Sequence, residues 1–240
     1  MVIVFDLDDT LYDESTFVRS GMQAVAKYLA SVLQEDADKI FCGLDAALQK
    51  QRNGVFDRYL EGRGIKSKKL VQKCLSIYRG HEPKISLLPA ARACLKRFQH
   101  HPIYVVTDGN RLVQKRKFLA LGLAPLVRRC FCTYAHGLHR SKPSPYCFEK
   151  ICRLEHVTPE EVVYVADNPH KDFVGLKSLG FGTIRVLQGA YATIKLGEAY
   201  EADVTINTLD ELDEAFLRHH KKLWAKNPVG FPVKHLIYEA

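Results

Sequence analysis

The stretch VIVFDLDDTL, residues 2–11, decides the fold of this 240-residue chain. Four apolar residues run directly into the carboxylates of Asp6, Asp8 and Asp9. A short apolar run that ends in a polar cluster predicts a strand buried on both faces, as in a parallel sheet. Because ligands of open α/β sheets bind at the carboxyl ends of the strands, we expect this strand to deliver Asp6 and Asp8 to a site. Several carboxylates held together at such a site are costly without a cation.

The composition is typical of a soluble globular protein. Hydrophobic residues make up 47% of the chain and charged residues 26%, which is ordinary for a soluble domain. No apolar run approaches the roughly 20 residues that span a bilayer, and the N-terminus lacks the pattern of a secretory signal. The seven cysteines include no Cys-x-x-Cys pair. We therefore expect free thiols in a reducing cytosol rather than a zinc site or a disulfide framework.

The formal net charge of +8 suits an anionic partner, although the sign alone does not say which one. Two basic stretches, residues 63–73 and 218–222, are not interleaved with aromatic residues as a nucleic-acid surface would be. We expect both stretches to be solvated faces, with no nucleic-acid and no membrane partner. A monomer or a weak homodimer is expected.

A block of helices is expected after Thr10, as far as about His81. Apolar residues recur there at a spacing of three to four, after a possible helix cap at Ser15 or Thr16. Further helices are expected over residues 36–51, 55–60 and 68–78, with glycines between them.

Strands and helices alternate from Pro89 onward, which predicts a parallel sheet with right-handed crossovers. Strands are expected over 103–107, 131–134, 162–166, 183–187 and 204–206, and helices over 92–99, 112–121, 145–154, 173–179 and 209–217. The fold class is therefore α/β, a doubly wound parallel sheet interrupted after its first strand by a helical insert. Whether the segment from Trp224 to Ala240 packs on this core is left open.

Polar residues follow three of the expected core strands. The first strand ends in Asp6, Asp8 and Thr10, and the others are followed by Thr107-Asp108 and by Asp167 with Asp172; Lys142 precedes a helix between them. In a parallel sheet these ends share one edge. Carboxylates suit Mg²⁺, which takes oxygen ligands and often a substrate phosphate, while hydroxyl, N–H and ammonium groups hold phosphate oxygens. The set is complete for phosphoryl transfer through an aspartyl-phosphate.

These residues resemble the four motifs of the haloacid dehalogenase (HAD) superfamily. Residues 6–11 are similar to its first motif, Thr107 to the second, Lys142 to the third, and Asp167 with Asp172 to the fourth. Order and spacing agree over nearly the whole chain, and the insert falls where members with a type 1 helical cap carry theirs. The resemblance implies a Rossmann-like catalytic core over 1–12 and 88–240 and a helical cap over 13–87.

The resemblance also implies a role for each residue. Asp6 would be the nucleophile, and Asp8 the general acid and base whose backbone carbonyl binds magnesium. Asp6 and Asp167 would supply carboxylate ligands, and Asp172 would be a further ligand or a residue that orients the ligands. The transferred phosphate would be bound by Thr107, by Lys142 and by the backbone N–H of Asp108.

The sequence therefore predicts a magnesium-dependent phosphatase acting on a small phosphorylated metabolite, a sugar phosphate or a nucleotide monophosphate. Asp108 stands where asparagine is frequent, so its carboxylate would repel a phosphate unless it is turned away. Asn168 follows Asp167 where related mutases often carry a second acid, which favours a phosphatase over a phosphomutase. Asp8 argues against dehalogenation, because the dehalogenases lack an acid/base aspartate there. A sugar-phosphate mutase and a non-catalytic anion-binding protein remain the alternatives.

Overall fold

The computed structural model describes residues 1–224, and the remainder of the segment from Trp224 to Ala240 lies outside the described residues. The chain divides into two compact units. An α/β unit comprises Met1–Asp13, Leu87–Gln114 and the described residues from Gly122; a helical unit comprises Glu14–Ser86 and Lys115–Leu121. Each unit has its own hydrophobic core.

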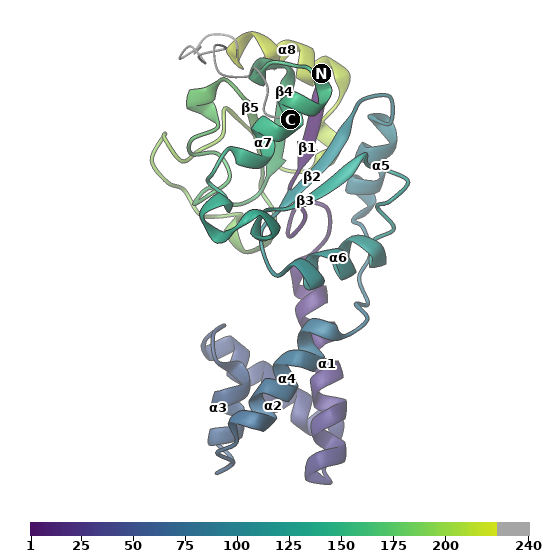
Figure 1. The fold of residues 1–240 in the computed structure, drawn as a ribbon, viewed down its shortest axis with the longest axis vertical. Coiled ribbons are helices and arrows are strands. Elements are labelled where there is room, and N and C mark those ends of the chain that lie inside the picture. Colours follow the sequence, from purple (N-terminus) through teal and green to yellow (C-terminus); the bar gives the residue numbers. More distant parts are fainter. Residues whose placement is uncertain (225–240) are drawn as a thin grey trace. The chain divides into compact units, whose positions relative to one another are not determined.

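The α/β unit is built on one six-stranded sheet in the order β3-β2-β1-β4-β5-β6. Its strands are β1 (Val2–Phe5), β2 (Ile103–Thr107), β3 (Arg129–Cys132), β4 (Val162–Ala166), β5 (Gly182–Val186) and β6 (Val204–Ile206). Every pair of neighbours is parallel. The predicted parallel α/β sheet is thus confirmed. Figure 1 shows the purple strand β1 inside the sheet, between β2 and β4.

The register of the central strands brings their carboxyl ends to one level. Phe5, the last residue of β1, lies opposite Val105 of β2 and Val165 of β4. In each of these three strands, the first polar residue therefore lies one or two positions beyond this aligned level. Since the strand order also reverses at β1, this is the edge of the sheet where a doubly wound fold binds its ligands.

Both faces of the sheet are covered, in keeping with the largely apolar sequences of its central strands β1, β2 and β4. All residues of β1, β2, β4 and β5 are buried. Val2 and Val4 contribute to a cluster with Phe148 of α7, while Ile3 and Phe5 alternate to the opposite face. The helices of this unit are α5 (Pro89–Arg97), α7 (Tyr146–Glu155) and α8 (Glu214–Trp224), together with the start of α6 (Arg111–Ala120), whose residues from Lys115 onward belong to the helical unit.

The helical unit contains α1 (Glu14–Leu33), α2 (Ala37–Lys50), α3 (Val55–Glu61) and α4 (Lys68–Gly80). Asp36 caps α2 by accepting a 2.9 Å hydrogen bond from the Lys39 N–H, and Ser67 caps α4 in the same way. The predicted cap at Ser15 or Thr16 is wrong, because α1 already begins at Glu14 and both residues lie within its first turn.

Two predicted helices of the α/β unit are also wrong. Only a single 3₁₀ turn, Lys177–Leu179, forms where a helix over 173–179 was expected, because Gly175 takes a positive φ of 86° and interrupts the segment. The predicted helix over 209–217 divides into the 3₁₀ turn Leu209–Glu211 and α8. Glu211 closes the first piece through a capping box, while Asp213 accepts a hydrogen bond from the Phe216 N–H at the start of the second.

Among the helices of residues 1–224, none combines the length and the apolar character that crossing a membrane requires.

A buried arginine fastens the irregular chain after β5. The Arg185 side chain is 2% exposed, and its Nη1 lies 2.6 Å from Oε2 of Glu201. Its Nη2 donates to the carbonyl oxygens of Tyr191 and Ile194, at 2.6 and 2.7 Å. One guanidinium thus holds three points of a segment that has little secondary structure of its own.

We expect Arg185→Leu to lower the free energy of unfolding by about 2–3 kcal/mol, because it leaves a carboxylate and two carbonyls without their donor. The matched control is Arg128→Leu, since Arg128 pairs with Glu155 at 2.8 Å but is 59% exposed. The control should cost less than about 1 kcal/mol. Chemical denaturation measures both values, and equal losses would contradict the anchoring role of Arg185.

Candidate active site

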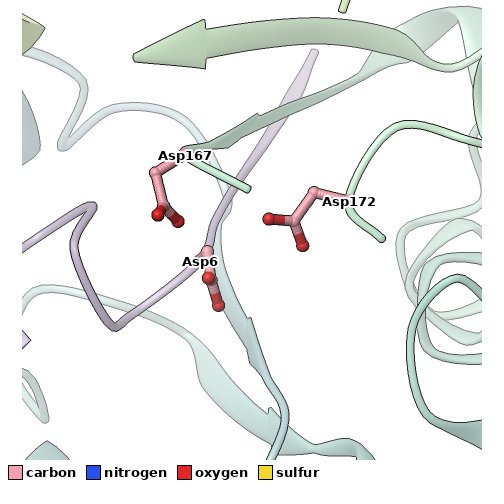
Figure 2. Close-up of side chains that lie close together, drawn as sticks. All are labelled: Asp6, Asp167 and Asp172. Carbon is pink, nitrogen blue, oxygen red and sulfur yellow. The ribbon is translucent and has the colours of Figure 1, made fainter. Parts of the chain in front are cut away.

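Three buried carboxylates meet at the carboxyl edge of the sheet. Asp6 directly follows β1, Asp167 directly follows β4, and Asp172 comes from the loop after β4 (Figure 2). All three are 3% exposed or less. Each offers one carboxylate oxygen, and these oxygens lie within 4.8 Å of one another. The structure therefore brings together three of the residues that the sequence selected.

Lys142 stands between two of these carboxylates. Its Nζ lies 2.9 Å from Oδ1 of Asp6 and 2.7 Å from Oδ1 of Asp172. The same ammonium donates to the hydroxyl of Tyr164 at 3.0 Å, and that hydroxyl donates to Oδ1 of Asp172 at 3.0 Å. The lysine ammonium and the tyrosine hydroxyl therefore hold Asp172 in a fixed position relative to Asp6.

Burial and crowding alter the acidity of the cluster. Burial raises the pKa of Asp6 to about 6, against the pull of Lys142 and with the added repulsion of Asp172. Burial also raises the pKa of Asp167 to about 9, and the charges of Asp6 and Asp172 push it in the same direction. Burial lowers the pKa of Lys142, but the two carboxylates beside it outweigh this and raise that pKa well above its usual value.

The donor set suits a divalent cation. Three carboxylates face one ammonium, so the cluster carries more negative than positive charge in a place that water reaches poorly. Mg²⁺ prefers oxygen ligands and needs only one or two carboxylates besides water and substrate. Asp6, Asp167 and Asp172 carry carboxylate oxygens that could fill this role.

Asp8 lies two residues beyond Asp6 and is only partly buried. Its carboxylate accepts a short hydrogen bond from the hydroxyl of Tyr12, and Gln114 donates to its other oxygen at 3.2 Å. Gln114 also donates to the backbone carbonyl of Asp108 at 2.8 Å. These donors fix the orientation of Asp8 at the same sheet edge as the buried cluster.

The structure shows which groups surround Thr107 and the Asp108 carboxylate after β2. Thr107 is buried, and its hydroxyl donates a 3.4 Å hydrogen bond to the backbone carbonyl of Asp108. The Asp108 carboxylate accepts hydrogen bonds from the Thr133 hydroxyl at 2.5 Å and from the Lys142 N–H at 3.2 Å. Burial raises the pKa of Asp108, but the charges of Lys142 and Lys171 outweigh it, so the pKa lies below its usual value. The Asp108 carboxylate is therefore charged, and its oxygens already accept hydrogen bonds from other groups of the protein.

The third carboxylate of the opening stretch points elsewhere. Asp9 has a left-handed backbone, with φ 53°, and its carboxylate accepts from the Ala190 N–H at 3.3 Å. A Cβ built on Gly189 would lie 2.3 Å from Cγ of Asp9, so only glycine fits beside it. Gln188 donates to the carbonyl oxygens of Asp9 and Thr10 at 3.2 and 2.8 Å. The turn that carries Asp8 is thus supported from the end of β5.

Sequence reasoning missed several residues that organise the site. Tyr164 reads as an ordinary strand residue, although a buried tyrosine needs a partner for its hydroxyl. Lys171 lies directly before Asp172, and its Nζ is 3.2 Å from Oδ2 of Asp108. Nothing in the sequence indicates a role for Gln114, because its contact with Asp8 depends on the position at which α6 begins. Asn110 caps that helix, accepting from the Leu112 N–H at 3.0 Å.

The arrangement provides the groups that phosphoryl transfer needs. A buried carboxylate, Asp6, is available as a nucleophile beside an ammonium that neutralises charge. A second carboxylate, Asp8, is less buried and is held by two donors, as a proton-transferring group should be. Asp167 and Asp172 add carboxylate oxygens that could bind a cation.

Comparison with known proteins identifies related chains. A family model for haloacid dehalogenase-like hydrolases matches residues 1–180. The chain is 30% identical over 220 residues to a glyceraldehyde 3-phosphate phosphatase of Methanocaldococcus jannaschii, covering 88% of this chain and 94% of that one. It is 29% identical over 229 residues to the Pyrococcus furiosus protein of the same name, covering 91% and 94%.

Solved structures are similar in fold. The crystal structure of a 2-haloacid dehalogenase from Pseudomonas syringae pv. tomato aligns with a TM-score of 0.62 at 22% identity, over 91% of this chain and 98% of that one. At this identity the likeness shows the fold alone. It agrees with the doubly wound sheet predicted from the sequence.

We expect Mg²⁺ to raise the melting temperature of the EDTA-treated protein. A ligand that binds only the folded state stabilises it by about 2.7 kcal/mol at a hundred times its dissociation constant. Asp167→Ala should lose most of this shift, because it removes one of the three clustered carboxylates. Asp57→Ala, at an exposed position of α3, should keep the shift. A shift of the same size in Asp167→Ala, measured by differential scanning fluorimetry, would remove Asp167 from the cation site.

Proposed function

The chain belongs to the haloacid dehalogenase-like hydrolases, and from that membership we propose that it is a magnesium-dependent phosphatase acting on a small phosphate monoester. The observation that carries the proposal is the pairing of buried Asp6 with Lys142 at 2.9 Å, beside Asp167 and Asp172 and two residues from Asp8. Both relatives described above are named glyceraldehyde 3-phosphate phosphatases. A small sugar phosphate of that kind is therefore the first substrate to test.

In the proposed first step, a carboxylate oxygen of Asp6 attacks phosphorus. The bond from oxygen to phosphorus forms as the bond to the leaving oxygen breaks, which gives an aspartyl-phosphate. Asp8 donates its proton to the leaving oxygen, so the alcohol departs neutral. The contacts of Asp8 with Tyr12 and Gln114 support this role, since they orient a carboxyl group that water can reach.

In the second step, Asp8 acts as a base and takes a proton from water. The oxygen of that water attacks phosphorus, the Asp6 carboxylate leaves, and inorganic phosphate is released. Asp8 can act first as an acid and then as a base. The first step leaves it deprotonated, so it can accept a proton from water in the second.

The remaining residues neutralise charge and position the phosphate. Lys142 offsets the charges that Asp6 and the phosphate bring together. Thr107 and the Asp108 N–H bind phosphate oxygens in this proposal. Asp6, Asp167 and the backbone carbonyl of Asp8 would hold magnesium, with Asp172 as a ligand or as the residue that orients them. When bound, the cation neutralises the developing charge on the phosphate.

The helical segment 13–87 is the cap in this proposal, and the core comprises 1–12 and 88–240. Residues that recognise the non-reacting part of the substrate are to be sought in the cap. The seven cysteines are all free, which supports a reducing, cytoplasmic setting. A monomer or a weak homodimer stays a prediction.

Release of inorganic phosphate tests the proposal directly. The purified protein is incubated with Mg²⁺ and a panel that contains glyceraldehyde 3-phosphate, hexose phosphates and nucleotide monophosphates, with an EDTA-treated control. We expect phosphate release that depends on Mg²⁺ and is fastest for a small sugar phosphate. Isomerisation of a sugar phosphate without phosphate release would instead identify a mutase, and binding without any turnover would identify a non-catalytic protein.

Asp6→Asn should lower turnover by about 10⁴-fold or more, because an amide is a poor nucleophile and the residue acts as part of a unit. Asp9→Asn is the matched control in the same stretch, since asparagine tolerates the left-handed backbone of Asp9. The control should keep most of the activity. Circular dichroism verifies that both variants fold, and substantial turnover by folded Asp6→Asn would exclude Asp6 as the nucleophile.

Asp8→Asn should lower turnover of an alkyl phosphate by about 10²–10⁴-fold, the usual contribution of a positioned acid or base. The first step with p-nitrophenyl phosphate should suffer less, because its leaving group needs no proton. A burst of p-nitrophenol in stopped-flow measurements would reveal this difference. Equal loss in the first step for both esters would contradict the role of Asp8 as general acid.

A further inference from the structure

The carboxylate of Asp108 is the point where four segments of the site meet. Its Oδ1 accepts from the Thr133 hydroxyl at 2.5 Å and from the Lys142 N–H at 3.2 Å. Its Oδ2 accepts from Nζ of Lys171 at 3.2 Å. One side chain after β2 is thus joined to the end of β3, to the segment that carries Lys142 and to the loop between Asp167 and Asp172.

This carboxylate lies next to the residue proposed to bind phosphate. Asp108 follows Thr107 directly, and its side chain is only 11% exposed, so water screens its charge poorly. A carboxylate in that position repels a phosphate dianion unless a cation neutralises it. Hydrogen bonds from the Thr133 hydroxyl and the Lys142 N–H orient Asp108 but bring no net charge.

Lys171 supplies the charge that Asp108 requires. Its side chain is 33% exposed, and its ammonium is directed at the Asp108 oxygen that faces away from the two neutral donors. The ammonium of Lys142 lies within 3 Å of Asp6 and Asp172, and its charge also acts on Asp108. Lys171 is the lysine whose ammonium pairs directly with the Asp108 carboxylate, at 3.2 Å.

We propose that Lys171 is a positioning residue of the phosphate site, which neutralises Asp108 and holds its carboxylate away from the phosphate. The proposal rests on the phosphate site of the proposed function. Lys171 is required in this role because residue 108 is a charged aspartate. A neutral residue at position 108 would not repel the phosphate and would not need a cation beside it. In this assignment Lys171 acts through Asp108 and does not itself contact the phosphate.

Binding of inorganic phosphate, measured by isothermal titration calorimetry in the presence of Mg²⁺, tests the proposal without depending on turnover. Lys171→Met leaves Asp108 charged and unpaired, and we expect it to weaken phosphate binding about tenfold, as one poorly screened charge would. Lys177→Met is the matched control. Lys177 is 26% exposed and lies 3.8 Å from Asp203, outside the carboxylate cluster. The control should bind phosphate as the wild type does.

The double variant Asp108→Asn/Lys171→Met separates the proposal from its rival. The asparagine oxygen can still accept from the Thr133 hydroxyl and the Lys142 N–H, so the junction keeps its neutral donors while both charges are gone. If Lys171 acts by neutralising Asp108, binding should return to within about threefold of the wild type. If Lys171 contacts phosphate directly, the double variant stays as weak as Lys171→Met, and the proposal is overturned.

The remaining outcomes are equally decisive. Unchanged phosphate binding by Lys171→Met overturns the proposal. If Lys171→Met fails to fold while the double variant folds and binds, the need to neutralise Asp108 is supported; if neither folds, Lys171 serves the fold independently of Asp108 and the proposal is wrong. A wild-type protein that binds phosphate but hydrolyses no ester refutes the proposed function, whereas the inference about Lys171 is still judged by the binding data.

Discussion

The ammonium of Lys142 between Asp6 and Asp172 is the interaction on which the site depends. Three carboxyl groups are buried within 4.8 Å of one another, and the ammonium of Lys142 offsets the repulsion between Asp6 and Asp172. Tyr164 completes this arrangement from inside the sheet, since its hydroxyl contacts both the lysine and Asp172. The remaining excess of negative charge is what makes the place suitable for a divalent cation.

The parallel sheet explains how residues far apart in the chain reach this place. The register aligns the ends of β1, β2 and β4, and side chains that follow those strands meet without long connections. Two lysines oppose these negative charges. Lys142 pairs with Asp6 and Asp172 at the centre, and Lys171 pairs with Asp108 beside them. The proposed site for a charged ligand is therefore made of side chains that already pair with one another.

The sheet and the proximity of three aspartates at its edge are predicted from the sequence because both follow from local patterns. Apolar runs bounded by polar residues mark the strands, and Asp6, Asp167 and Asp172, which follow two of these strands, do lie together. Their roles stay a prediction. The helix expected over 173–179 fails because Gly175 breaks it, and its left-handed conformation is set by the tertiary structure. Tyr164, Gln114 and Lys171 are missed for a related reason. The groups that these side chains contact depend on the conformation of the loops, and the hydrophobic periodicity of the sequence does not predict loop conformation.

The glycine at position 189 illustrates how widely the constraints on such a site extend. It lies far along the chain from Asp9, beyond β5, yet a methyl group there would collide with that carboxylate. Asp9 is bonded to Asp8, so any side chain at 189 would displace the turn that carries the proposed proton donor. The substitutions that this protein tolerates are therefore restricted beyond its motifs, at a position that neither its charge nor its place in the sequence marks as part of the site.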